Sequence, residues 1–410
     1  MKSLRVDGRL SFIVLLASQL AATMGFTFVL PFIPIYVQAL GVEDAGSAAA
    51  WAGVINSSTA VTMALAAPLW GRLGDRVGLK PMLLRATIAG SLVVGLMGLV
   101  ASPWQLLALK TLQGCLTGTV AAATVLVSAT APHSRAGERL GTLQMVIFVA
   151  AAAGPFFGGA FADLVGIRAS FGVTAALLAA SAVLISVWVK EERPAEEEAE
   201  EEESARAEGP LPHRRLAPAL LALFVVQVAI MSAAPVLPGF LSTLMEEPVR
   251  VATLAGWIIA TGALAASLGS VIGGKLAARF GTRKVIIWTL LLAGITSLPQ
   301  AGIDSIALLW TLRLITGLFV GIAVPVANLA IRGAVHPRRQ GEAFGVAATA
   351  TSAGNAVGPA AGGLLASSFG FGAPFLVPGL CLAAVSAIIW GAPLLAVGYR
   401  TAVRVALERF

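Results

Sequence analysis

The feature that most constrains this chain is a succession of apolar stretches. A helix needs roughly 20 apolar residues to cross about 30 Å of hydrocarbon. Twelve such stretches predict an all-α membrane protein with twelve spanning helices, over residues 11–40, 51–70, 82–101, 104–130, 139–162, 168–189, 216–244, 252–274, 284–301, 305–331, 342–366 and 372–396. The first stretch is too long for the core of a signal peptide, so we predict that it is a retained helix.

The composition excludes an ordinary soluble enzyme. Of the 410 residues, 57% are hydrophobic and 12% are charged, whereas about 25% are charged in a typical soluble domain. The two cysteines lie inside apolar stretches, and the three histidines lie in separate polar segments. These residues cannot supply a disulfide framework or a histidine-rich metal site. We therefore expect no metal and no cofactor.

The basic residues predict the orientation of the chain. With an even number of spans both termini share a side, and 24 of the 28 lysines and arginines fall in segments on that side. Only Arg168 and Arg250 lie in segments on the opposite side, and Lys110 and Arg313 fall inside the fourth and tenth spans. Because basic loops stay in the cytoplasm, we predict a multi-pass protein of the cytoplasmic (inner) membrane with both termini cytoplasmic. The excess of basic residues thus indicates a protein oriented in the lipid bilayer and not one that binds nucleic acid. We also expect a monomer.

The sequence repeats itself at an offset of 203 to 204 residues. Four pairs of segments match: 71–78 with 274–281, 110–114 with 313–317, 154–159 with 358–363, and the prolines at 31 and 34 with those at 235 and 238. An even number of spans in each copy gives both copies the same orientation. The repeat therefore predicts two six-helix lobes related by a pseudo-two-fold axis along the membrane normal.

The predicted domains follow from this repeat. An N-terminal lobe covers residues 1–190, a C-terminal lobe covers 216–398, and a basic cytoplasmic tail covers 399–410. Between the lobes, residues 191–215 hold ten acidic and four basic residues with three prolines. Such a segment cannot bury apolar area, so we predict a solvated tether in the cytoplasm. A regulatory or lipid-sensing role for this linker is the alternative.

Three motifs occur in order: GRLGDRVGLK at 71–80, KTLQGCLTG at 110–118 and GPFFGG at 154–159. Together they resemble the motifs of the major facilitator superfamily, specifically its drug/proton antiporter branch with twelve spans, and most closely the MdtG-like multidrug efflux proteins. The first motif has Leu79 where the family usually has a basic residue, and the second begins with Lys110 in place of arginine. The third is similar to the motif associated with exporters. The resemblance covers nearly all of the chain outside the linker.

The first and third motifs supply candidate gating residues. Three glycines in residues 71–78 allow a tight turn between two helices, and glycines with a proline in a membrane helix permit close packing and a bend. The resemblance implies that Asp75 forms a latch at the positive end of span eleven, which starts near Glu342, and that the third motif is a hinge. Packing alone, and basic residues that only set topology, are the simpler alternatives. The candidate gating residues are Gly71, Asp75, Arg76, Gly78, Lys80, Gly154, Pro155, Gly158 and Gly159.

The resemblance also places spans one, four, seven and ten around a substrate cavity. Apolar and aromatic surface with a few amides suits adaptable binding of amphipathic molecules, although each such residue can equally serve helix packing. The candidate cavity residues are Gln19, Thr23, Phe26, Thr27, Lys110, Gln113, Thr117, Gln227, Met231, Arg313, Thr316, Phe319 and Asn328.

Lys110 and Arg313 are equivalent in the repeat and carry the strongest functional signal. At 1.5 Å per residue they lie roughly 9 to 12 Å from the span ends, and charges at such depth usually mark a pathway. Snorkelling to the headgroups is the alternative. A buried charge needs a partner, and arginine cannot practically deprotonate, so Arg313 requires water or an anion. We expect the substitution Lys110→Gln to weaken binding of an anionic ligand less than Arg313→Gln does, because the position of Lys110 gives it easier access to water.

No Asp or Glu falls near the middle of any predicted span, so the resemblance alone implies proton coupling. The plausible relay sites are peripheral: Asp75, Glu138, Asp163 and Glu342. The predicted function is export of amphipathic small molecules by alternating access, as in multidrug efflux and antibiotic resistance, with the proton gradient as energy source. The alternative is an exporter or flippase of an anionic or zwitterionic lipid or lysolipid. A non-transporting sensor has no domain to signal through, and a membrane enzyme is disfavoured because no catalytic motif is present.

Overall fold

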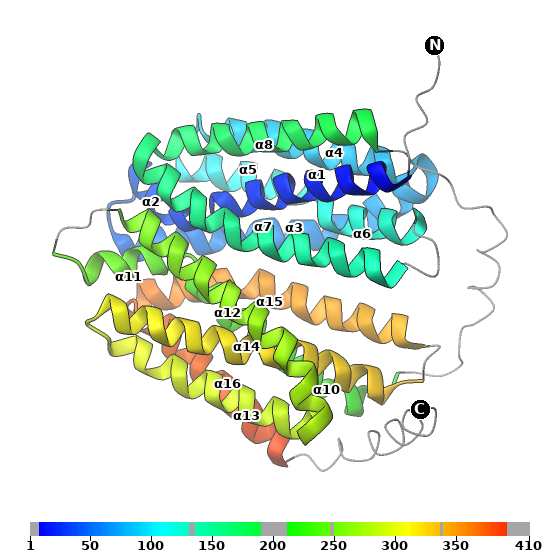
Figure 1. Ribbon diagram of the computed structural model, residues 1–410. Coiled ribbons are helices and arrows are strands. Elements are labelled where there is room, and N and C mark those ends of the chain that lie inside the picture. Colours follow the sequence, from blue (N-terminus) through cyan, green and yellow to red (C-terminus); the bar gives the residue numbers. More distant parts are fainter. Residues whose placement is uncertain (1–7, 131–135, 190–210, 247–249, 337–338, 392–410) are drawn as a thin grey trace. The chain divides into compact units, whose positions relative to one another are not determined.

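The computed structural model describes residues 8–130, 136–189, 211–246, 250–336 and 339–391. Within these ranges the chain is helical and contains no strand (Figure 1). Its elements are α1 (Gly8–Phe28), η1 (Leu30–Phe32), α2 (Ile33–Ala39), α3 (Ala45–Val77), α4 (Leu79–Met97), α5 (Pro103–Leu116), α6 (Thr119–Thr130), α7 (Ala136–Val165), α8 (Ile167–Trp188), α10 (His213–Ala233), α11 (Leu237–Thr243), α12 (Val251–Phe280), α13 (Thr282–Ser297), η4 (Leu298–Gly302), α14 (Ile306–Ala334), α15 (Gln340–Phe369) and α16 (Ala373–Gly391).

In this part of the chain, ten helical segments are long and apolar enough to cross a membrane. They correspond to every predicted span except the fourth and the eleventh. The eleventh is α15, one continuous helix of 30 residues that is rich in glycine, alanine, serine and threonine and is therefore less apolar. An α-helix satisfies its own backbone hydrogen bonds, which is why it can cross hydrocarbon. The prediction of an all-α membrane fold is confirmed.

The fourth predicted span is broken, so the expectation of one continuous helix over 104–130 is wrong. Helix α5 ends at Leu116, where the backbone of Thr117 becomes extended (φ −102°, ψ −172°). Gly118 follows with φ +134°, a backbone conformation that glycine adopts readily and that residues with a Cβ atom rarely adopt. Helix α6 then begins at Thr119.

Prolines break the first and seventh spans in the same way. Pro31 and Pro34 separate α1 from the short helix α2 through the 3-10 turn η1. In the second copy, Pro235 lies in the turn between α10 and α11, and Pro238 lies in α11. Proline has no backbone N–H and cannot continue the hydrogen-bond ladder of a preceding helix.

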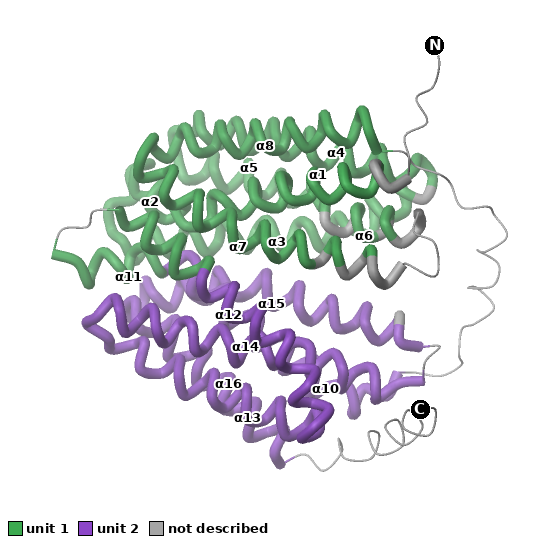
Figure 2. The backbone as a smooth tube through the Cα atoms, viewed as in Figure 1, with its two compact units in different colours: residues 1–198, 237–260 green, residues 199–236, 261–410 purple. Residues whose placement is uncertain are grey.

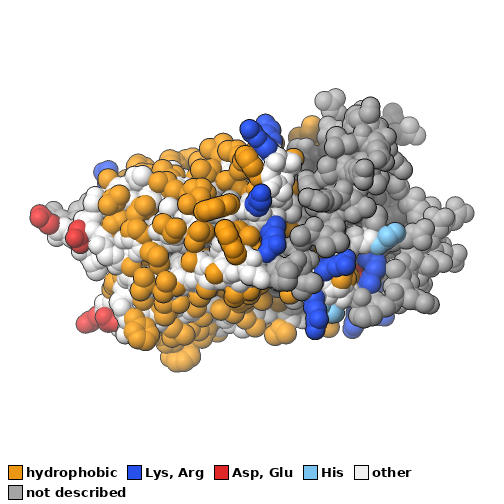
Figure 3. Space-filling view, turned by 90° about the horizontal axis from the view of Figure 1, so that it is seen from below, with side chains coloured by type: hydrophobic (Ala, Val, Ile, Leu, Met, Phe, Trp, Pro, Cys, Tyr) orange, Lys and Arg blue, Asp and Glu red, His pale blue; other side chains and the backbone are white. Residues whose placement is uncertain are grey.

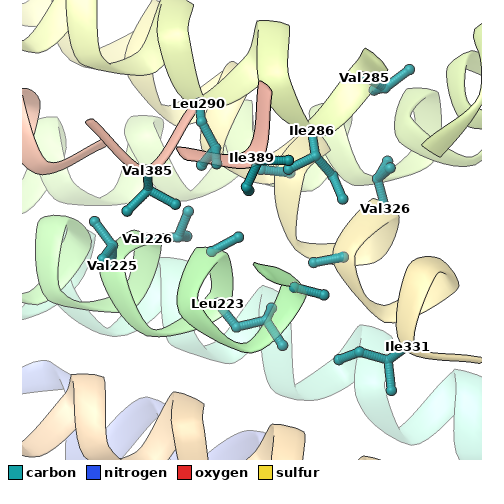
Figure 4. Packing of buried hydrophobic residues seen from close by; sticks show 14 of the residues in the cluster. Leu223, Val225, Val226, Val285, Ile286, Leu290, Val326, Ile331, Val385 and Ile389 are labelled. Atoms are coloured by element: carbon teal, nitrogen blue, oxygen red, sulfur yellow. The ribbon is translucent and has the colours of Figure 1, made fainter. Parts of the chain in front are cut away.

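By its contacts the chain forms two compact units (Figure 2). Unit 1 consists of residues 1–198 and 237–260, and unit 2 of residues 199–236 and 261–410. The sequence repeat assigns 237–260 to the second copy, but this segment has its contacts within unit 1. Unit 1 has an aromatic core in which Tyr36 and Phe171 lie 5.0 Å apart between ring centroids. Unit 2 is built on branched aliphatic residues, among them Leu223, Leu290 and Ile389 (Figure 4).

Glycines bring helix backbones into contact at equivalent positions of the two units. In each contact, a Cβ added to the glycine would collide with a backbone carbonyl of the neighbouring helix. The contacts in unit 2 are those of unit 1 displaced by 203 or 204 residues, so the structure confirms the internal repeat. They join Gly114 to Thr59 and Gly158 to Phe28 in unit 1, and Gly317 to Gly262 and Gly362 to Ser232 in unit 2.

Many outward-facing side chains are hydrophobic. Figure 3 shows such side chains over much of the visible face, with most of the visible lysine and arginine side chains away from the end where most of the visible acidic side chains lie. In unit 2, Leu268, Val271, Ile388 and Trp390 are each more than half exposed. Soluble monomers rarely expose large apolar patches, whereas lipid solvates them. The protein is therefore a multi-pass membrane protein.

We predict that Gly158→Ala destabilises the protein by about 1–3 kcal/mol, because the added methyl group forces α7 away from the carbonyl of Phe28 in α1. The midpoint of thermal unfolding of the purified protein measures this effect. Gly172→Ala in α8 is the matched control, because its Cβ would meet no atom within 4 Å. Equal unfolding temperatures for the two variants would contradict the packing role of Gly158.

Candidate functional site

The candidate gating loop turns at a single glycine. Residues 71–77 are the last part of helix α3, so the expectation that Gly71 and Gly74 take part in the turn is wrong. Gly78 alone leaves the helical conformation, with φ +107°, and its N–H donates to the carbonyl of Gly74 at 2.8 Å. One left-handed glycine is a sufficient stop for a helix, and α4 begins at the next residue. The side chain of Asp75 lies outside the described part of the structure, so its latch stays a prediction.

Lys80 has a structural contact within unit 1. Its Nζ donates to the carbonyl of Ser186, in the last turn of α8, at 3.0 Å. At the equivalent position of unit 2, Arg283 Nη2 donates to Ile389 at 3.2 Å and to Trp390 at 2.7 Å, at the end of α16. A cation stabilises the negative end of a helix dipole. These bases therefore fasten the third helix of each copy to the sixth, while Arg76 is exposed.

Sequence reasoning missed a contact between Trp70 and Arg85. The Arg85 Cζ atom lies 3.3 Å from the centroid of the Trp70 ring, and the indole N–H of Trp70 donates to the carbonyl of Cys115 at 2.6 Å. These contacts join α3, α4 and α5. Neither residue was among the candidate site residues, and no sequence spacing indicates that Arg85 stacks on Trp70.

The residues of the third motif are sites of close helix approach. Gly154 faces Thr27 and the carbonyl of Met24 in α1, and Gly159 faces the carbonyl of Ala252 in α12. The carbonyl of Pro155 in turn faces Gly256 of α12. Small residues permit this approach between membrane helices. The packing interpretation is therefore supported for all four motif residues, and the hinge stays a prediction.

Asp163, one of the peripheral acids, caps the first turn of α12. Its Oδ2 atom accepts a hydrogen bond from the N–H of Thr253 at 2.7 Å and another from the Thr253 hydroxyl at 2.6 Å. A carboxylate at a helix N-terminus satisfies a free amide and complements the helix dipole. The two residues lie 90 positions apart, and no local pattern pairs them.

A cavity of about 570 Å³ opens beside this cap within unit 1. Its polar lining includes Asp163, Arg168 and Tyr36, whose hydroxyl donates to the carbonyl of Met97 at 2.8 Å. Neither Arg168 nor Tyr36 was among the candidate site residues. Within the described ranges, no group of three or more His, Cys, Asp or Glu side chains could hold a metal ion.

In unit 1 the candidate cavity residues are largely buried. Gln19 on α1 is 0% exposed, and neither its Nε2 nor its Oε1 has a hydrogen-bond partner. Thr23, one turn further along α1, also lacks a partner for its hydroxyl. Phe26 and Thr117 come together over Gly90 of α4. Thr27 instead donates to Thr23 and Ala150 carbonyls, so it contributes to packing between α1 and α7.

In unit 2 the candidate cavity residues are mostly paired or packed. Gln227 Nε2 donates to Asn355 Oδ1 at 2.6 Å, and Met231 packs on Gly358. The Thr316 hydroxyl lies 2.9 Å from Gln300 Nε2. Of the remaining candidates, Phe319 packs against the aliphatic core and Asn328 is half-buried.

Of the two intramembrane bases, Lys110 is the more buried, although the sequence predicted that Lys110 has the easier access to water. Lys110 is only 3% exposed, whereas Arg313 is half-buried, with its Cζ atom 5.0 Å from the centroid of the Phe375 ring. Among the described residues, no carboxylate lies within 4.0 Å of either base. The expectation that Lys110 has easier access to water is therefore wrong. Counting residues from a span end measures depth, but burial also depends on which helix face packs against a neighbour.

Two copies of a membrane-helix bundle, with an intramembrane base at equivalent positions, are the layout of a transporter. The Major Facilitator Superfamily profile matches residues 15–252 and 219–402. The chain belongs to the major facilitator superfamily.

Relatives in this superfamily are similar over most of their length. The chain is 33% identical over 352 residues to the multidrug resistance protein MdtG of Proteus mirabilis (strain HI4320), covering 86% of this chain and 88% of the relative. It is 34% identical over 363 residues to MdtG of Dickeya zeae (strain Ech586), covering 86% of each chain. The crystal structure of a bacterial homolog to the human lysosomal transporter Spinster is similar in fold, with a TM-score of 0.79, 16% identity and coverage of 95% of this chain and 97% of that one.

We predict that Asp163→Ala weakens the first turn of α12 by about 0.5–2 kcal/mol, the usual range for loss of a helix cap. Hydrogen exchange of the amides near Thr253 is the measurement, and these amides should exchange faster in the variant. Asp304→Ala is the matched control, because Asp304 is an exposed carboxylate between η4 and α14. Unchanged exchange at Thr253 would remove Asp163 as a cap.

Proposed function

We propose that the protein is a secondary active transporter that exports amphipathic small molecules, as in multidrug efflux. The observation that carries this proposal is the pair of intramembrane bases, buried Lys110 and half-buried Arg313, at equivalent positions of the two copies. Burying a cation inside a membrane helix is costly, and such residues usually mark a transport pathway. The names of the MdtG relatives support the class of substrate. The protein binds and moves its cargo without changing it chemically, and it acts as a monomer.

The proposed location is the inner membrane, with both termini and the linker 191–215 in the cytoplasm. The excess of lysine and arginine on one side of the predicted topology supports this orientation. Transport then proceeds by a rocker-switch movement of the two lobes. The Asp75 latch and the hinge in residues 154–159 are the proposed moving parts.

The proposed energy source is the proton gradient. Acidic residues lie at the ends of spans and in loops, not near span centres. Proton exchange therefore uses a peripheral carboxylate. Of the peripheral carboxylates, that of Asp163 accepts two hydrogen bonds from Thr253.

Transport into inverted membrane vesicles tests this function directly. We expect uptake of amphipathic probes that rises when a pH gradient, acidic inside, is imposed and that collapses when a protonophore removes the gradient. Cationic, neutral and anionic probes of similar size should be compared in the same vesicles. Uptake that is unaffected by the gradient would contradict proton coupling, and no uptake of any probe would contradict the exporter.

A second candidate function is export of an anionic or zwitterionic lipid or lysolipid. The specific observation in its favour is that both intramembrane bases lack a carboxylate within 4.0 Å among the described residues. Arg313 keeps its charge at any accessible pH. Water or an anion supplied by the cargo must therefore balance it.

We predict that Arg313→Gln weakens binding of an anionic amphiphile about tenfold or more while binding of its cationic counterpart is unchanged or stronger, because a buried charge pair is typically worth more than 1.4 kcal/mol. Equilibrium binding of the matched pair to the purified protein is the measurement. Arg332→Gln is the control, because Arg332 is an exposed base at the end of the same helix. Equal losses for both ligands would leave the general drug exporter as the better description.

A further inference from the structure

Lys110 and Gln113 are two buried polar side chains on α5. They are one helical turn apart, so they lie on the same face, with Cβ atoms about 5–6 Å apart. Lys110 is 3% exposed and Gln113 is 4% exposed. Lys110 has no carboxylate within 4.0 Å, and Gln113 Oε1 has no hydrogen-bond partner among the described residues. The pair thus combines a buried cation with a buried lone acceptor.

The backbone that carries this pair is fixed on the neighbouring helix. The Thr59 hydroxyl of α3 donates to the carbonyl of Lys110 at 3.0 Å, and the Thr62 hydroxyl donates to that of Thr111 at 3.0 Å. Gly114 lies directly against the carbonyl of Thr59. The backbone from which both side chains project is therefore fixed before any ligand arrives. Preorganised groups bind more tightly, because less conformational entropy is lost on binding.

The equivalent pair in unit 2 is different. Gln113 corresponds to Thr316, whose hydroxyl lies 2.9 Å from Gln300 Nε2 and 3.0 Å from the Thr296 hydroxyl. The position equivalent to Gln300 in the first copy is Met97, whose side chain has no amide group that could donate a hydrogen bond to Gln113. In unit 2 the unpartnered acceptor among the described residues is Oε1 of Gln300, which lies in η4 and not on α14, the helix that carries Arg313. The combination of base and free acceptor on one turn belongs to unit 1 alone among the described residues.

We propose that Lys110 and Gln113 bind an amphiphile that carries an anionic group within a few bonds of an N–H or O–H donor, as in an N-acyl amino acid. The Lys110 ammonium donates to the carboxylate of the ligand, and Gln113 Oε1 accepts the hydrogen bond of its amide N–H. Such a ligand gives the buried ammonium a carboxylate and gives Gln113 Oε1 the donor that it lacks among the described residues. This assignment rests on the proposed function, because it names the cargo of the same transport pathway.

The probes for the test are N-dodecanoylglycine and N-dodecanoylsarcosine below their micellar concentrations. They share the acyl chain and the carboxylate, but in the second a methyl group replaces the amide hydrogen. We expect the full-length protein in lipid nanodiscs to bind the glycine probe about tenfold more tightly, since leaving a buried acceptor unpaired typically costs 1–3 kcal/mol and tenfold corresponds to 1.4 kcal/mol. Gln113→Leu should abolish this preference, and Lys110→Gln should weaken both probes alike.

Two further variants make the outcome decisive. Thr289→Val in α13 is the control in the second copy, because the buried Thr289 hydroxyl donates to carbonyls of its own helix, and this variant should retain the preference for the glycine probe. Gln113→Met repeats the loss of the acceptor with an unbranched side chain, in case Gln113→Leu folds poorly. Neither Gln113 variant should lower the unfolding temperature without ligand, because each removes a buried acceptor that has no partner.

Equal binding of the two probes by the wild type, or a preference that survives in both Gln113 variants, would overturn the assignment. So would a loss of preference in Thr289→Val equal to that in Gln113→Leu. These are binding measurements and do not depend on flux. Uptake of other amphiphiles in vesicles, together with no discrimination between the two probes, would remove this ligand class and leave the exporter intact. Discrimination without any vesicle uptake would retain the binding site and remove the exporter.

Discussion

Close contact between helix backbones at glycine is the constraint on which both units depend. In a bilayer, apolar side chains gain little by leaving lipid for another helix, so association relies on tight packing and on hydrogen bonds between helices. The contact of Gly114 with α3 provides both, because it brings the hydroxyls of Thr59 and Thr62 within reach of backbone carbonyls of α5. The same glycine positions recur in the second copy. Since glycines, which have no side chain, determine how the helices pack, the side chains on the other helix faces are free to differ between the copies.

The parts of the structure that the sequence predicted are those that depend on local composition or on repetition. Apolar length predicted the spanning helices, and the matched glycines predicted two copies of one bundle. The break at Thr117 and Gly118 was missed because apolar residues continue on both sides of it. The turn of the gating loop was placed over three glycines although one suffices, since a glycine inside a helix and a glycine that ends one have the same sequence signature.

The contacts of the candidate site were less predictable, because they depend on which helices become neighbours. Asp163 could be recognised as an acid at a span end, but only the fold brings it to the first turn of α12. Lys80 carried a gating interpretation from its motif, and the structure adds a partner at the end of α8. Lys110 and Arg313 occupy equivalent positions of the repeat. Their burial nevertheless differs, because Lys110 is 3% exposed whereas Arg313 is half-buried with its guanidinium over the ring of Phe375.

In a duplicated bundle, a few substitutions can leave a polar side chain hydrogen-bonded in one copy and its equivalent without a partner in the other. In unit 2, Gln227 is held by Asn355 and Thr316 by Gln300. The first copy has Thr23 and Gln113 at the positions of the two held residues, and Ala151 and Met97 at the positions of their partners. An apolar residue in place of each partner removes the internal hydrogen bond and leaves the polar group buried without compensation. In the proposed binding site the same exchange favours a ligand that supplies the missing partner, because pairing a buried polar group removes the cost of leaving it unpaired.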